Sequence, residues 1–177
     1  MHCHYQDFII RDWQPRDRQM AADLIFAVLS EYGLECEADD ADSDVLNVES
    51  AYWETGGQFW VVEYAGQLVG TAGFYPVSRR PHSVEIRKMY LHPNVRGKGL
   101  GRWLLNALED AIAHAGHHFI WIETASVLKE AVRLYESNGY QPSTGVETAR
   151  CDLVYVKPVN SVAQPGAGSP SSAIGDA

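Results

Sequence analysis

The sequence predicts a single α/β domain whose sheet is mostly antiparallel and contains one central parallel strand–helix–strand unit. Three strand-like runs, 58–64, 67–76 and 83–91, are joined by short links, which favours an antiparallel meander. The run 119–123 is continuously apolar and follows a helical repeat, which is typical of a parallel strand covered on both faces. A chain of 177 residues is long enough for one domain with a sizeable core.

The first third of the chain predicts a strand and two helices. The apolar run 8–13 suits a first strand, and Pro15 then helps to turn the chain into a helix that Gly33 caps. The segment 44–55 predicts a second, less regular helix that ends at Gly56. The apolar residues of the first helix recur every four positions, as Met20, Leu24, Val28 and Tyr32.

The second half predicts two amphipathic helices and the last strands. A helix that opens at Gly99 and ends near Gly116 carries one apolar face, formed by Leu100, Leu104, Leu108 and Ile112. A further helix starts after Ser126 and closes at Gly139. The last strands are expected at 140–142 and 151–157.

The stretch 84–102 predicts a strand, a glycine-rich turn and the start of a helix. Because the first N–H groups of a helix lack partners within it and lie at the positive end of its dipole, the turn predicts an anion site, most naturally for a phosphate. The stretch holds five Arg or Lys against one Glu in a chain of formal charge −9, which favours a polyanionic ligand. A glycine-rich connection without a ligand is the alternative.

Two common phosphate-binding patterns are absent from this turn. The P-loop spacing G-x-x-x-x-G-K-[ST] does not occur, and the run from Gly97 to Gly101 is G-x-G-x-G in mid-chain instead of the dinucleotide fingerprint G-x-G-x-x-G. A nicotinamide-dependent oxidoreductase is therefore disfavoured.

Composition narrows the class of protein further. The acidic charge disfavours nucleic acid as a partner, and the longest apolar run, 24–29, is too short to span a membrane. The start of the chain does not resemble a signal peptide, so a cytoplasmic location is the expectation. Three separated cysteines, Cys3, Cys36 and Cys151, predict free thiols, and no metal is expected at the terminal pair His2 and His4. The stretch 158–177 is mostly Pro, Gly, Ser and Ala and predicts a disordered tail after a domain of residues 1–157.

Two motifs in this order resemble the GCN5-related N-acetyltransferase (GNAT) superfamily. Arg96-x-x-Gly99-x-Gly101 is similar to the loop of that family that binds the pyrophosphate of acetyl-CoA, and 131–140 is similar to its A-x-x-L-Y-E-x-x-G-F/Y segment. The resemblance implies about seven strands and four helices, with acetyl-CoA as cosubstrate in a split of the sheet. It implies backbone pairing of the pantetheine arm with Met89, Tyr90 and Leu91, and a pyrophosphate held by Arg96, Gly97, Lys98, Gly99, Leu100, Gly101 and Arg102.

The resemblance also implies direct attack of an uncharged primary amine on the thioester, with an amide near Met89 or Tyr90 stabilising the oxyanion. Tyr135 matches the tyrosine acid of the family, and packing in the core is the alternative for it. Glu85 and Glu123 are both candidates for the base, and water is a third. One departure is Leu128, which stands where many members have an asparagine that contacts the cofactor.

The acceptor is the least determined part of the prediction. The link 35–44 holds six carboxylates and no base, so it is either a solvated loop or an attractor for a small cationic amine. Acetylation of a peptide α-amino group is the second hypothesis, and a non-catalytic acyl-CoA sensor is the third. A homodimer remains open.

Overall fold

The computed structural model describes residues 1–35, 37 and 41–159 of the chain. Cys36 and the greater part of the predicted tail lie outside the described residues. The first two residues of that predicted tail are described: Pro158 ends the last strand, and the Val159 N–H donates to the His118 carbonyl at 2.8 Å.

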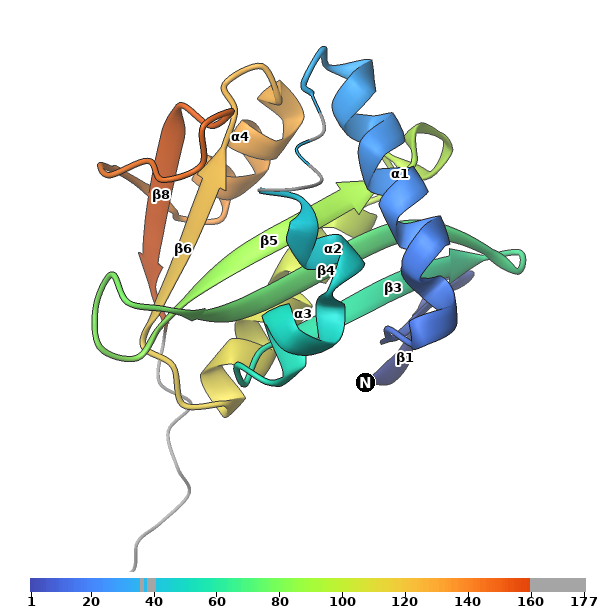
Figure 1. Cartoon of the computed structure of the whole chain (residues 1–177), viewed down its shortest axis with the longest axis horizontal. Coiled ribbons are helices and arrows are strands. Elements are labelled where there is room, and N and C mark those ends of the chain that lie inside the picture. The colour runs from blue at the N-terminus through green and yellow to red at the C-terminus, as the bar shows by residue number, and fades with distance from the viewer. Residues whose placement is uncertain (36, 38–40, 160–177) are drawn as a thin grey trace, which may run out of the picture.

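Eight strands of the described residues form one sheet in the order β1-β2-β3-β4-β5-β6-β8-β7 (Figure 1). All neighbouring pairs are antiparallel except β5 and β6, which confirms the predicted mixed sheet and its parallel unit. The strands are β1 (His2–Tyr5), β2 (Phe8–Asp12), β3 (Gln58–Tyr64), β4 (Gln67–Val77), β5 (Ser83–Leu91), β6 (Phe119–Thr124), β7 (Gln141–Ser143) and β8 (Leu153–Pro158). The sequence did not predict β1, a short edge strand that pairs with β2.

The longer helices lie close to their predicted positions. They are α1 (Arg18–Glu31), α3 (Leu100–His114) and α4 (Lys129–Ser137), with short 3₁₀ turns at Pro15–Asp17 and Pro93–Val95. The predicted second helix is instead two short pieces, α2 (Ser43–Leu46) and a π-helical turn, η2 (Glu49–Trp53).

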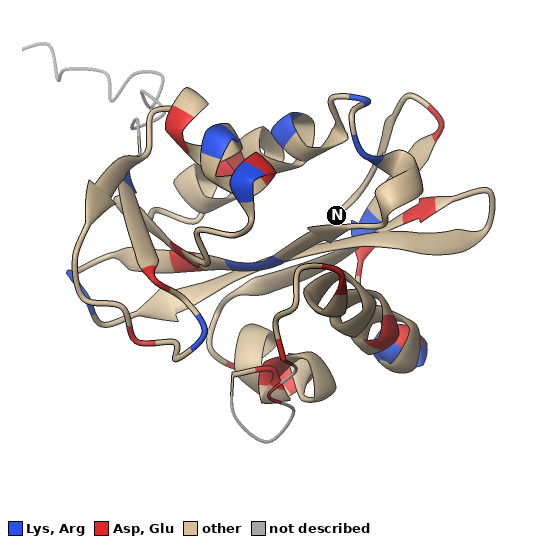
Figure 2. Ribbon diagram, turned by 90° about the horizontal axis from the view of Figure 1, so that it is seen from above, with Lys and Arg blue, Asp and Glu red and all other residues tan. Residues whose placement is uncertain are grey.

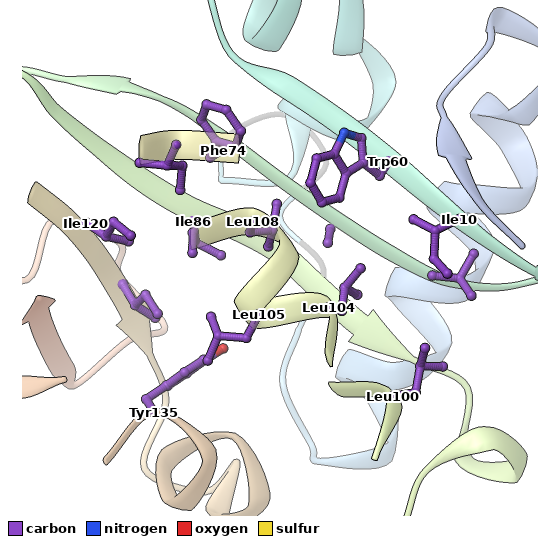
Figure 3. Packing of buried hydrophobic residues seen from close by; sticks show 14 of the residues in the cluster. Ile10, Trp60, Phe74, Ile86, Leu100, Leu104, Leu105, Leu108, Ile120 and Tyr135 are labelled. Carbon is purple, nitrogen blue, oxygen red and sulfur yellow. The ribbon is translucent and has the colours of Figure 1, made fainter. Parts of the chain in front are cut away.

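Helices cover both faces of the sheet, as the edge-on view shows (Figure 2). The apolar face of α3 packs on one face of the sheet, where Leu104 and Leu108 are fully buried beside Trp60 and Ile86 (Figure 3). On the opposite face, α1 packs against β4 and β5 and η2 against β3 and β4, with Ile25, Tyr52 and Phe59 in the second cluster. Alternate residues of β3 therefore serve the two cores, as strand geometry requires.

The sheet splits between its two parallel strands. β5 and β6 pair only from Ser83–Phe119 to Glu85–Trp121, although β5 continues to Leu91. Beyond this point the two strands diverge (Figure 1). The carboxyl half of β5 is therefore unpaired on the side that faces β6, and a cleft opens there.

A β-bulge interrupts β5 within this unpaired half. The register with β4 shifts between Thr71 and Gly73, and Lys88 has a left-handed φ of 52°. The Thr71 hydroxyl donates to the Lys88 carbonyl at 2.7 Å and caps the bulge. Such a bulge bends a strand and redirects its backbone groups.

Candidate active site

A cavity of about 440 Å³ lies in the cleft between β5 and β6. It extends from the glycine turn before α3, past the unpaired half of β5 and the start of α4, to the segment that precedes β8. Every element predicted to bind the cofactor or to act in catalysis borders this one cavity.

The glycine turn presents free backbone donors to one end of the cavity. In the described part of the chain, the N–H groups of residues 97–102 donate to no other protein group. Gly97 and Gly99 have φ of 75° and 78°, a conformation that a side chain would strain, and Gly99 is the N-cap of α3. Unpaired N–H groups at the start of a long helix fit a pyrophosphate.

The basic side chains of this turn are already engaged within the protein. Arg96 donates to both carboxylate oxygens of Glu31 at 2.7 and 2.8 Å. Arg102 donates to the Ser137 hydroxyl at 2.9 Å, and the Lys98 ammonium lies 5.5 Å from the centre of the Tyr64 ring. The donors that the turn offers to an anion are therefore mainly backbone N–H groups, whereas the sequence emphasised its cationic side chains.

The structure places most of the predicted cofactor residues on the cavity. Lys98 and Leu100 do not line it, and Leu100 is instead part of the core under α3. The residues that do line it are Met89, Tyr90, Leu91, Arg96, Gly97, Gly99, Gly101 and Arg102.

Tyr135 lines the same cavity from α4 and is only 6% exposed. Its ring packs 5.9 Å from that of Tyr140 and 6.4 Å from that of Tyr155. Its hydroxyl makes no hydrogen bond within the described residues. Burial raises the pKa of Tyr135, and neighbouring Tyr90 raises it further.

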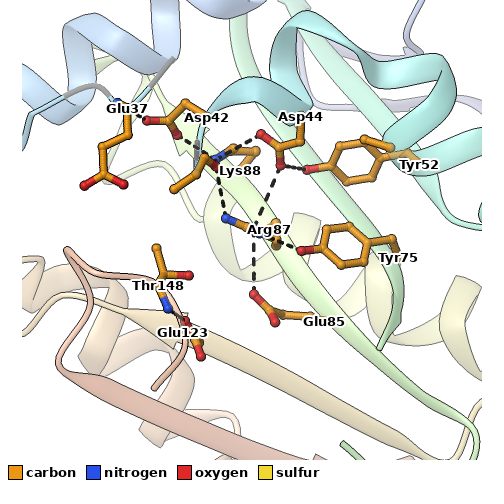
Figure 4. Close-up of polar contacts among 12 residues, drawn as sticks. Glu37, Asp42, Asp44, Tyr52, Tyr75, Glu85, Arg87, Lys88, Glu123 and Thr148 are labelled. Carbon is orange, nitrogen blue, oxygen red and sulfur yellow. Dashed lines mark hydrogen bonds and ion pairs between the residues drawn. The ribbon is translucent and has the colours of Figure 1, made fainter. Parts of the chain in front are cut away.

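Glu85 lies on β5, at the last residue pair before the cleft opens (Figure 4). It is 5% exposed and accepts no hydrogen bond within the described residues; its nearest cationic atom is Nε of Arg87, 3.7 Å from Oε1. Burial raises the pKa of Glu85 to about 7, against the opposing attraction of Arg87.

Glu123 lines the cavity from β6 but has a different environment. It pairs with Arg79 and accepts the backbone N–H groups of Glu147 and Thr148 at 2.7 and 2.8 Å. Burial opposes its charge, but these hydrogen bonds and Arg79 outweigh burial and lower the pKa of Glu123. Of the two predicted candidates, only Glu85 has a carboxylate without bound donors.

Two carboxylates of the acidic link are engaged within the protein, whereas Glu35 is exposed. Asp42 is completely buried against Lys88, and Asp44 accepts the Tyr52 hydroxyl at 2.7 Å (Figure 4). Asp39 and Asp40 lie outside the described residues. The sequence did not reveal this network, although a lysine between apolar strand positions was one sign that a buried partner exists.

Comparison with known proteins agrees with the geometry of this site. A family model for the acetyltransferase (GNAT) family matches residues 23–140. The uncharacterized N-acetyltransferase YjgM of Escherichia coli is 36% identical over 140 residues, which are 77% of this chain and 83% of that protein. A GNAT acetyltransferase from Staphylococcus aureus has the same fold, with a TM-score of 0.80 at 19% identity over 86% of this chain and 99% of that one.

A further structure of the same fold contains the cofactor. The acetyltransferase yncA of Salmonella typhimurium, solved with acetyl-CoA, has a TM-score of 0.69 at 24% identity over 92% of this chain and 99% of that one. The chain belongs to the GNAT family of acetyltransferases. It is an acyl-CoA-dependent acetyltransferase whose cosubstrate is acetyl-CoA. No helix within the described residues combines the length and the apolar character that crossing a membrane requires.

Proposed function

We propose that this protein acetylates the primary amine of a small cationic molecule, with Glu85 as the base and Tyr135 as the acid. The observation that carries the proposal is that both side chains line one cavity from opposite sides of the cleft. Glu85 lies on β5, whereas Tyr135 lies on α4, which follows β6. Neither side chain makes a hydrogen bond within the described residues, so both are available to substrates.

Glu85 has the properties of a general base near neutral pH. A carboxyl with a pKa of about 7 is partly ionised there and basic enough to take a proton from a bound ammonium. An ammonium would also find its partner charge at Glu85, because the carboxylates of Asp42 and Asp44 are occupied by protein donors. The attraction of a cationic acceptor therefore rests on Glu85 more than on the acidic link.

Tyr135 has the properties of a general acid. Its raised pKa keeps the proton on the phenol at neutral pH, so the hydroxyl is available as a donor to the sulfur of the departing thiolate. A tyrosine that served only for packing would be expected to bury its hydroxyl against a partner.

Acetyl-CoA supplies the acetyl group. The backbone N–H groups of residues 97–102 would bind its pyrophosphate, and the unpaired edge of β5 at Met89, Tyr90 and Leu91 would bind its pantetheine arm. An amide at Met89 or Tyr90, beside the bulge, would donate to the acetyl oxygen.

The first experiment is thermal unfolding with and without acetyl-CoA, with NADH as the control ligand. At 100 times its dissociation constant, acetyl-CoA should add about 2.7 kcal/mol to the free energy of unfolding, which raises the melting temperature by several degrees. A panel of small amines and short peptides is then tested by release of the CoA thiol.

The panel distinguishes the proposed acceptor from its alternatives. Thiol release with small polyamines or diamines supports the proposal, and release with peptides alone would replace it with α-amino acetylation. Stabilisation by acetyl-CoA without thiol release for any amine would indicate a sensor instead of an enzyme.

A further inference from the structure

Asp42 is a buried carboxylate whose acceptor positions are all filled by the protein. Its Oδ1 accepts from Nζ of Lys88 at 2.6 Å and from Nη2 of Arg150 at 2.8 Å. Its Oδ2 accepts from Nη1 of Arg150 at 2.8 Å and from the Glu37 N–H at 3.0 Å. Burial of Asp42 opposes its charge, but Lys88 and Arg150 outweigh burial and lower its pKa.

The two cations belong to opposite sides of the cleft. Lys88 is on β5, in the half of the strand that no longer pairs with β6. Arg150 is in the segment that leads into β8, which pairs with β6 along its length. Asp42 thus connects the two diverging arms of the sheet where no backbone hydrogen bond joins them.

Lys88 is also the bulge residue of β5. Its φ of 52° is unfavourable for a residue with a side chain, so the surrounding contacts must hold it there. Two of these contacts come from the link before α2, since Nζ donates to Asp42 and, at 2.8 Å, to the Ala41 carbonyl. The Thr71 hydroxyl fixes the Lys88 carbonyl from the other side.

We propose that Asp42 is a positioning residue, which holds the Lys88 bulge and the Arg150 segment at a fixed separation and so aims the amide of Met89 or Tyr90 at the acetyl oxygen. Asp42 does not line the cavity, and it acts through Lys88 and Arg150. The inference rests on the proposed function, because it assumes that one of these two amides binds the acetyl group.

A buried ion pair with no role in the site would have a different signature. Removing Asp42 would then lower stability alone, since the buried Lys88 and the half-buried Arg150 would lose a partner. Asp17 provides the matched control, because it is also fully buried. Its two carboxylate oxygens accept hydrogen bonds from the Arg11 guanidinium at 2.6 and 2.9 Å. Asp17 does not line the cavity.

The test is isotope-edited infrared spectroscopy of bound acetyl-CoA, labelled with ¹³C at the thioester carbonyl. In the wild-type protein, hydrogen bonding should move the carbonyl band to lower frequency than in free acetyl-CoA. Asp42→Asn should lose most of this shift and lower the rate of thiol release roughly tenfold, less than the roughly 10²–10³-fold that follows deletion of a whole oxyanion donor. Asp17→Asn should lose stability but keep the wild-type band.

Each other outcome decides against a specific claim. A folded Asp42→Asn protein with the wild-type band overturns the positioning role, and so does an equal band change in Asp17→Asn. If Asp42→Asn does not fold, Lys88→Met is measured in its place. In that variant Asp42 keeps Arg150 as a partner, so less stability should be lost. An unchanged carbonyl band in Lys88→Met overturns the inference. A wild-type protein that binds no acetyl-CoA contradicts the proposed function itself.

Discussion

The Oε1 atom of Glu85 lies 3.7 Å from the Nε atom of Arg87, close enough for attraction but too far for a hydrogen bond. The guanidinium instead donates to the Tyr75 hydroxyl at 2.6 Å and to the Ala41 carbonyl at 3.2 Å. Arg87 therefore only partly compensates for the burial of Glu85, whose pKa rises to about 7. A base of this strength has testable consequences for both activity and stability.

The activity should rise with pH as Glu85 ionises. We expect kcat/KM for the amine to increase as the pH rises through about 7. In Glu85→Gln this increase should vanish, and kcat/KM above pH 7 should be lower than in the wild type by roughly 10²–10⁴-fold. The measurement is thiol release across a pH series. If kcat/KM of the variant increases with pH as it does in the wild type, Glu85 is not the base.

The same group should make stability depend on pH. The pKa of Glu85 is raised from 4.5 to about 7 in the folded protein, so the folded state binds more protons than the unfolded state between these values. The free energy of unfolding should fall as pH rises through this window, by up to about 3 kcal/mol. Glu85→Gln should remove this contribution and exceed the wild-type stability at pH 8, measured by urea unfolding; equal slopes in both proteins would contradict the shift.

Tyr135→Phe should lower turnover about 10²-fold and leave acetyl-CoA binding almost unchanged, because only the donated proton is lost. Tyr155→Phe is the matched control, since Tyr155 is buried beside Tyr135 but donates to Glu136 at 2.9 Å and does not line the cavity. The control should lose about 1 kcal/mol of stability and keep its turnover. If Tyr135→Phe also keeps the wild-type turnover at every pH, Tyr135 is not the acid.

Gly99→Val should abolish stabilisation by acetyl-CoA. The residue has a φ of 78°, which strains a β-branched side chain, and a Cβ there would lie 2.7 Å from the Tyr5 hydroxyl. Relief of this strain should change the backbone of the turn, so that its N–H groups lose their common direction. Gly116→Val is the control, because Gly116 has a similar φ of 81° but does not line the cavity. A Cβ added at Gly116 would have no atom within 4 Å. Thermal unfolding with acetyl-CoA measures both, and wild-type stabilisation of Gly99→Val would refute the pyrophosphate assignment.

Local patterns were sufficient to predict several of the elements that border the cavity. The helical spacing of Leu104 and Leu108 predicted α3, and the glycines before it predicted the turn that borders the cavity. The family motif singled out Tyr135, which the structure places on the same cavity. These features depend on neighbours in the sequence, which a pattern records.

The buried network around Asp42 and the environments of the two glutamates depend on contacts between distant residues. Asp42 meets Lys88 and Arg150, which are 46 and 108 positions away in the chain. Glu85 and Glu123 are both strand carboxylates in the sequence, and only the fold distinguishes them, by placing the backbone of Thr148 against one of them. No periodicity or spacing contains this information.

Glu123→Gln tests the structural role of the second carboxylate. Because Glu123 holds Arg79 and the N–H groups of residues 147 and 148, the variant should lose about 1–3 kcal/mol of stability, measured by urea unfolding. The folded pKa of Glu123 is lowered, so its contribution is present at neutral pH and is lost as pH falls below the usual range of a glutamate. The pH limb of activity near 7 should remain in Glu123→Gln, since that limb belongs to Glu85. If Glu123→Gln instead loses the pH dependence of activity near 7 and keeps the wild-type stability, Glu123 is the base and Glu85 is not.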